Sequence, residues 1–167
     1  NGIGEQIQDV MIYPMYSDLK TLTTGMNGVF TFPVIPLGTN VMFKPSKNTD
    51  TNNGVSTLDL LMIRKHIIGV EFLTSPFQHI AADINKDKKI STADLVELRK
   101  VILLQQPTFN TNESWRFVKS SYQFANPENP LTEQFPEAHQ YNGISKSDYK
   151  LDFKGVKVGD VDDSAKA

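Results

Sequence analysis

The chain of 167 residues contains no cysteine. This absence excludes disulfide bonds, thiolate zinc sites and cysteine nucleophiles, but it leaves the compartment open, because many secreted proteins also lack cysteine. No apolar run approaches the roughly 20 residues that a membrane-spanning helix needs. The formal net charge of −2 gives no reason to expect nucleic acid or an anionic membrane as a partner.

Catalytic motifs are equally scarce. The three histidines, His66, His79 and His139, are scattered and have no metal-like partner at helical or turn spacing. The sequence has no glycine-rich phosphate loop and no order of serine, histidine and aspartate that stands out from chance. We therefore predict a protein that is not an enzyme. Near the C-terminus, Asp160, Asp162 and Asp163 are interpreted as a solvated acidic cluster in preference to a further cation site.

What the sequence does contain is a crowd of oxygen-bearing side chains in "DINKDKKISTADL", residues 83–95. Calcium takes six to eight oxygen ligands, and an EF-hand-type loop of about 12 residues supplies them from positions 1, 3, 5, 7, 9 and 12. A bound cation would explain why so many like charges lie together. The predicted ligands of this loop are Asp83, Asn85, Asp87, the backbone carbonyl of Lys89, Ser91 and Asp94.

An internal repeat strengthens this interpretation. At an offset of 35 residues, "NTDTNNGVSTLDL", residues 48–60, falls into register with the first stretch. A solvated Asp/Asn turn before a capped helix would explain either loop alone, but not two in register. The pattern predicts two calcium sites. The predicted ligands of the earlier loop are Asn48, Asp50, Asn52, Gly54, Ser56 and Asp59.

Each loop leads into a predicted helix. Leu60, Ile63 and Ile67 share one helical face, and the corresponding residues of the second repeat do the same. A serine three residues before the last aspartate of each loop resembles a capping box, so metal site and helix start share residues. The later loop offers three carboxylates and the earlier loop two, which predicts tighter binding at the later loop. Its sixth position, Lys88, must adopt a left-handed conformation that lysine disfavours.

These paired loops resemble a dockerin module, and the similarity covers about residues 47 to 104. Both "NTDTNNGVSTLDLLMIRKHIIG" and "DINKDKKISTADLVELRKVIL" are similar to the dockerin repeat, with aspartate at position 12. The resemblance implies two Ca²⁺ ions and exit helices that dock onto a cohesin partner. The recognition positions that it implies are Thr57, Leu58 and Lys65 in the first repeat, and Thr92, Ala93 and Lys100 in the second.

Residues 1–46 have a different pattern. Alternating apolar residues around Ile12, Phe30, Phe32 and Phe43, with turns between them, predict a small antiparallel β-sandwich. "NGIGEQIQDVMIY" and "TTGMNGVFTFPVIPLG" resemble the carboxypeptidase regulatory-like, transthyretin-like family. In that family a strand precedes the position of Asn1, which implies an open sheet edge. Three explanations stay open: a cut fragment, a cleaved upstream strand, or a strand donated by a neighbouring subunit.

Residues 108–167 form the third predicted segment. "SWRFVKSSYQF" and "YKLDFKGVKVGDV" predict strands, separated by a loop rich in proline and asparagine. This arrangement is similar to a tail that follows dockerin-like repeats in large secreted proteins of Bacteroidetes-type bacteria. We expect Trp115, Phe117 and Phe153 to pack against the calcium-loop helices or the sandwich.

The sequence thus predicts an α+β chain in three parts: a β-sandwich at 1–46, a dockerin-like calcium-binding pair at 47–107, and a C-terminal β segment at 108–167 that packs back. The favoured function is a non-catalytic, extracellular calcium-binding structural module of a bacterial surface protein, in adhesion or fibre assembly. Its partner would be a neighbouring subunit or an adjacent domain. The alternative is a recognition module that binds a cohesin-like receptor and tethers a secreted enzyme.

Overall fold

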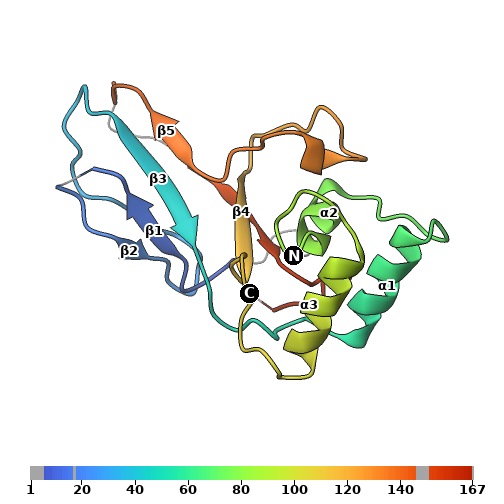
Figure 1. The fold of residues 1–167 in the computed structure, drawn as a ribbon. Coiled ribbons are helices and arrows are strands. Elements are labelled where there is room, and N and C mark those ends of the chain that lie inside the picture. The colour runs from blue at the N-terminus through green and yellow to red at the C-terminus, as the bar shows by residue number, and fades with distance from the viewer. Residues whose placement is uncertain (1–5, 17, 146–150, 167) are drawn as a thin grey trace.

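The computed structural model describes residues 6–16, 18–145 and 151–166, and shows a mixed α+β architecture (Figure 1). Among these residues, no helix has the length and apolar character that crossing a membrane requires. The elements in chain order are β1 (Met11–Pro14), β2 (Leu22–Thr23), β3 (Val41–Ser46), α1 (Thr57–Ile67), α2 (Pro76–Ala82), α3 (Thr92–Ile102), β4 (Trp115–Lys119), the 3₁₀ turn η1 (Pro130–Thr132), β5 (His139–Tyr141) and β6 (Phe153–Lys157).

A four-stranded antiparallel sheet, in the order β2-β1-β3-β5, forms one side of the molecule. Three of its strands come from the first 46 residues, and the fourth comes from the C-terminal segment, where Val41 of β3 pairs with Tyr141 of β5. The sheet therefore joins two segments that are far apart in the sequence. The start of the first segment, residues 1–5, where the resemblance places an open edge, lies outside the described residues.

The strand expected around Phe30 and Phe32 is not formed, so this prediction is wrong. Pro33 follows directly, and because proline has no amide hydrogen it cannot donate to a strand ladder. The aromatic side chains still reach the core, since the ring centroids of Phe32 and Phe43 are 4.9 Å apart. The alternation correctly identified side chains that pack together, but not the backbone conformation.

The antiparallel pair β4 and β6 lies between the four-stranded sheet and the helices (Figure 1). Successive side chains of a strand point to opposite faces. On β4, Trp115 and Phe117 pack into the core of the sheet, whereas Val118 packs into the core formed with the helices. The same helix-side core contains Val156 of β6. This pair therefore connects the two cores. We expected Trp115, Phe117 and Phe153 to pack against the helices or the N-terminal β segment, and all three pack on the side of the sheet.

The helices begin where the sequence indicates. Ser56 caps α1 and Ser91 caps α3, each with the reciprocal contact of a capping box. The sequence analysis did not predict α2, which begins with its own box at Ser75 and has proline at its first position. Helix α1 packs against α3, and α2 packs against β6. Each calcium loop leads directly into one of the two packed helices, the earlier loop into α1 and the later loop into α3.

A histidine pair links α1 to α2 and predicts a pH effect on stability. The ring centroids of His66 and His79 are 5.2 Å apart, and Nδ1 of His66 accepts the backbone N–H of Leu73 at 3.2 Å. Burial, followed by the charge of His79, lowers the pKa of His66 below its ordinary value of 6.5. The neutral form thus stabilises the fold, and that stabilisation is lost as the pH falls below about 6.5.

In millimolar calcium, which keeps the loop carboxylates ionised, we expect the melting temperature to fall between pH 7.5 and pH 5. We expect His66→Asn to reduce this fall, because the amide oxygen accepts the same hydrogen bond but does not titrate. Thermal unfolding at the two pH values measures the effect in both chains. An equal fall in wild type and variant would show that other groups cause it.

Candidate calcium sites

The later loop begins at Asp83, directly after α2, and ends at Asp94 in the first turn of α3. Two of its residues adopt left-handed conformations, Lys86 with φ of +59° and Lys88 with φ of +69°. The left-handed backbone expected at Lys88 is thus present. Lysine has a Cβ that disfavours this region, so loop closure carries a conformational cost that its other contacts must offset.

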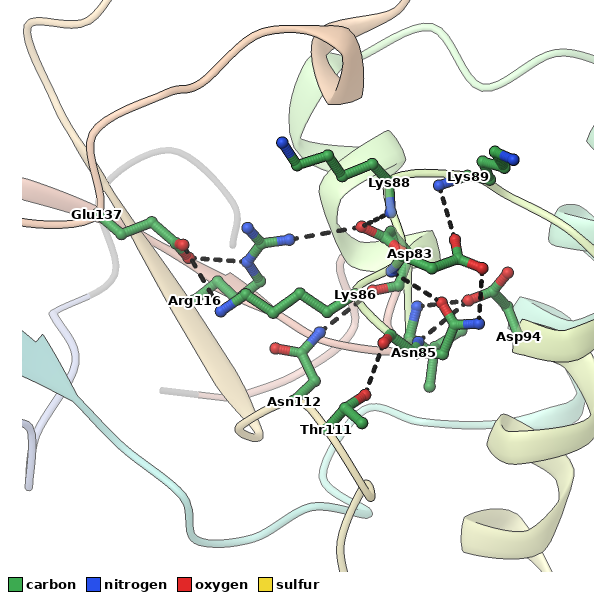
Figure 2. Close-up of polar contacts among 12 residues, drawn as sticks. Asp83, Asn85, Lys86, Lys88, Lys89, Asp94, Thr111, Asn112, Arg116 and Glu137 are labelled. Carbon is green, nitrogen blue, oxygen red and sulfur yellow. Dashed lines mark hydrogen bonds and ion pairs between the residues drawn. The ribbon is translucent and has the colours of Figure 1, made fainter.

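Asp94 connects the two ends of this loop (Figure 2). Its carboxylate is fully buried, and Oδ1 accepts the backbone N–H groups of Ile84 and Asn85 at 2.9 and 3.1 Å. Its other oxygen, Oδ2, accepts the backbone N–H of Ser91 at 2.8 Å. The predicted ligand at position 12 therefore shapes the start of the loop and caps the exit helix at the same time.

Asp83, at position 1, has a buried carboxylate oxygen without a hydrogen-bond donor among the described residues. The side chain is 1% exposed, and this oxygen is Oδ1. Oδ2 lies 3.3 Å from the N–H of Lys88 and 3.8 Å from Nη1 of Arg116 (Figure 2). Burial raises the pKa of Asp83 to about 6, although the charge of Arg116 opposes this rise. A buried carboxylate oxygen without a donor suits a hard cation such as calcium.

The remaining predicted ligands of this loop lie near the surface. Oδ1 of Asn85 accepts the N–H of Asp87 at 3.0 Å, and a carboxylate oxygen of Asp87 accepts the N–H of Lys89 at 2.9 Å. Each contact spans two residues, so the loop winds around its own oxygens. These local contacts hold the loop between Asp83 and Asp94 in one winding turn, and Ser91 caps the helix α3 that follows it.

The sequence analysis missed the residues that hold this loop from outside. Nδ2 of Asn112 donates to the backbone carbonyl of Asp83 at 3.1 Å, and Arg116 pairs with Glu137 at 2.8 Å. Burial works to raise the pKa of Glu137, but the hydrogen bond and charge of Arg116 outweigh it and hold that pKa below its usual value. No short sequence pattern predicts these contacts, because they join segments that are far apart in the chain.

The earlier loop differs from the later loop in the contacts of its first half. Asp59 is fully buried, and its Oδ2 accepts the N–H of Ser56 at 2.8 Å, as predicted for the second half of the loop. In the first half, Oδ1 of Asn48 instead accepts both the N–H and the hydroxyl of Ser114, at 2.9 and 3.1 Å. Asp50 and Asn52 are exposed. The structure does not repeat here the arrangement of the later loop.

Instead, two aspartates of the C-terminal segment lie beside Asp59. One oxygen from each of Asp59, Asp160 and Asp162 falls within 4.8 Å of the other two. Asp160 is only 6% exposed, so the interpretation of a solvated terminal cluster is wrong for this residue. Val158 and Val161 on either side of it are buried, and the backbone N–H of Val161 donates to Oδ1 of Asp59 at the start of α1. Of the three aspartates in the terminal cluster, Asp162 is partly buried and only Asp163 is exposed.

Comparison with known proteins bears on the central segment alone. The curated proteins and the solved structures gave no match. The resemblances inferred for residues 1–46 and for the C-terminal tail remain predictions. Residues 48–106, which hold both loops and helices α1, α2 and α3, match the family model of the dockerin type I domain.

Proposed function

We propose that the chain is a non-catalytic, extracellular recognition module that binds a cohesin-like receptor in a calcium-dependent manner. One observation carries the proposal: two calcium-type loops, each followed by a serine-capped helix, fall within the segment that matches the dockerin type I domain. The orphaned carboxylate oxygen of Asp83 supports the calcium part independently. Calcium is millimolar outside cells, which suits sites with few carboxylates.

The first turns of α1 and α3 offer the surface for such a receptor. On α1, Leu58 is 50% exposed and Leu61 is 48% exposed. On α3, Val96, which corresponds to Leu61 in the repeat, is 56% exposed. Thr57 and Thr92 are also exposed beside them. Apolar side chains ringed by polar ones are typical of a protein-binding surface.

Calcium would control this surface through the helix starts. Ser56 and Asp59 cap α1, and Ser91 and Asp94 cap α3. All four are also predicted ligands, so an ion that orders their side chains orders the first turn of each helix. A helix start that loses its cap loses about 1 kcal/mol. We therefore expect receptor binding to require calcium.

The test is binding of purified chain to a panel of cohesin-like domains, measured by calorimetry in calcium and in chelator. We expect binding in calcium only, and at least a tenfold loss of affinity, about 1.4 kcal/mol, for Leu58→Ala/Lys65→Ala or for Thr92→Ala/Lys100→Ala. Val34→Ala is the matched control, because Val34 is 92% exposed and belongs to the sheet segment.

A structural role in adhesion or fibre assembly is the second candidate. It is favoured by the shared packing of the helices with β4 and β6, since the dockerin-like segment is not separate from the C-terminal strands. Calcium-dependent filaments in electron micrographs, together with no binding to any cohesin-like domain, would favour this role over receptor docking. In both roles we propose a bacterial cell surface as the location, on the resemblance of the tail to secreted Bacteroidetes-type proteins.

A further inference from the structure

The contacts of Asp59 reproduce those of Asp94, but their donors come from the C-terminus. Oδ1 of Asp94 accepts the backbone N–H groups of residues 84–85, which are positions 2 and 3 of its own loop. Oδ1 of Asp59 accepts the N–H groups of residues 161–162, at 2.8 and 3.3 Å. Residues 161–162 therefore occupy the place of positions 2 and 3 in the earlier loop.

The equivalence extends to position 1. In the later loop, the N–H of Lys88 lies 3.3 Å from Oδ2 of Asp83. In the C-terminal segment, the N–H of Ala165 donates to Oδ2 of Asp160 at 2.8 Å, with the same separation of five residues. Both aspartates are buried, at 1% and 6% exposure. Asp160 thus takes the place that Asp83 has in its loop.

Positions 3 to 5 match as well. Oδ1 of Asp162 accepts the N–H of Ser164 at 3.1 Å, as Oδ1 of Asn85 accepts the N–H of Asp87 at 3.0 Å. The residue between donor and acceptor is left-handed in both segments, with φ of +62° and +59°. The C-terminal segment therefore winds like the first half of the later loop.

The two chain segments meet where an unbroken loop would continue. A Cβ added to Gly54, which is position 7, would clash with Cα of Ala165, so the two backbones are in direct contact. The hydroxyl of Ser164 donates to the carbonyl of Gly54 at 3.1 Å. Beyond this point, the backbone of Lys166 and the side-chain amide of Asn53 exchange hydrogen bonds. Position 6 of one segment thus adjoins position 7 of the other.

We propose that the first calcium site is split between two distant segments of the chain. Asp160, Asp162 and Ser164 supply the ligands of its first half, in place of the predicted residues 48–52, and residues 54–59 supply the second half. This inference rests on the proposed calcium-binding function. The donor set fits the ion, because three carboxylates and further hard oxygens converge as calcium requires.

Two consequences follow from a split site. The first site gains the carboxylates of Asp160 and Asp162 in addition to Asp59, so the predicted weakness of this site loses its basis. In addition, an ion held by both segments fixes the C-terminus against the start of α1. Calcium then joins the dockerin-like segment to β6, which only packing and hydrogen bonds otherwise connect.

The test is calcium titration of the full chain by calorimetry. We expect the double variant Asp160→Asn/Asp162→Asn to bind one calcium ion where wild type binds two, and Asp50→Asn to retain two. Asparagine keeps the shape of aspartate and removes the charge, so the two variants are matched. Two ions in the double variant, or one in Asp50→Asn, would overturn the split site.

Folding failure is controlled with a milder change. Asp162 is only partly buried, so the single variant Asp162→Asn should fold, as far-ultraviolet circular dichroism would show. It should lower the affinity for one of the two calcium ions at least about tenfold. Unchanged affinities in this variant would also contradict the proposal. If wild type binds no calcium, the proposed function fails. If wild type and every C-terminal variant bind two ions equally, the split site alone fails.

Discussion

Asp83→Asn should remove most of the calcium-dependent rise in melting temperature that the later loop provides, and leave stability in chelator unchanged or higher. Asp83 is 1% exposed, and its Oδ1 has no hydrogen-bond partner among the described residues. Without a cation, this buried charge destabilises the fold, and the neutral amide removes that cost. With calcium, the same charge is a ligand that the amide replaces poorly.

The expected size follows from linkage. A site occupied at 100 times its dissociation constant stabilises the fold by about 2.7 kcal/mol. For a chain of this length, about 2–4 °C per kcal/mol gives a lost rise of roughly 5–10 °C. Thermal unfolding in millimolar calcium and in chelator measures it, and Asp152→Asn, an exposed aspartate away from both loops, is the control. Equal losses in both buffers would mean that Asp83 is an ordinary turn residue.

A substitution of Asp94 would not separate the calcium-dependent loss of stability from the calcium-independent loss as clearly. The two oxygens of Asp94 accept N–H groups at both ends of the loop and cap α3. Its removal therefore destabilises the fold in chelator as well as in calcium. The sequence places Asp83 and Asp94 in the same class of predicted ligand. The structure distinguishes them, because Oδ1 of Asp83 has no hydrogen-bond partner among the described residues, whereas both oxygens of Asp94 hold the loop.

The later loop could be predicted from the sequence because its contacts are local. Asn85, Asp87 and Ser91 each bond to a residue two or three positions away. Such contacts leave a regular spacing of residue types that can be read directly. The helix starts were predictable for the same reason. Helix α2 had an equally clear signal in Ser75 and Pro76, which the sequence analysis did not use.

The earlier loop could be predicted only in its second half. The hydrogen bond that occupies Asn48 comes from Ser114, 66 residues along the chain. The donors to Oδ1 of Asp59 are more than 100 residues away. A repeat in the sequence shows that two segments had similar patterns, but it does not show which residues meet in space. Spacing alone therefore could not show that Asp160 and Asp162 lie beside Asp59.

The sheet is a further case in which long-range pairing decided the outcome. β5 has only three residues, and nothing in their pattern indicates that they pair with β3. The aromatic alternation at Phe30 and Phe32 gave the stronger strand signal, but the proline after it prevents ladder formation. Local propensity is a weak guide where burial and pairing partners come from elsewhere in the chain.

Trp115→Ala should cause the largest loss of stability of any single substitution considered, about 3–5 kcal/mol. Trp115 is 1% exposed and begins β4, the strand between the two cores. Its side chain shares one core with Ile12 and Phe43 of the four-stranded sheet and with Val10, which directly precedes β1. Removing it leaves a cavity at the junction of the sheet with the β4–β6 pair. Both the lost burial and the unfilled volume then destabilise the fold.

Trp115→Phe is the matched control, because it keeps an aromatic ring and removes a donor with no partner. The indole Nε1 is buried and has no hydrogen-bond partner among the described residues. Trp115→Phe therefore removes the desolvation penalty of this unpaired N–H, which offsets part of the stability lost with the smaller side chain. We expect Trp115→Phe to destabilise the fold less than half as much as Trp115→Ala. Denaturant unfolding followed by far-ultraviolet circular dichroism measures both, since the only tryptophan is changed. Equal losses for the two variants would show that the indole itself, and not the filling of this junction, stabilises the fold.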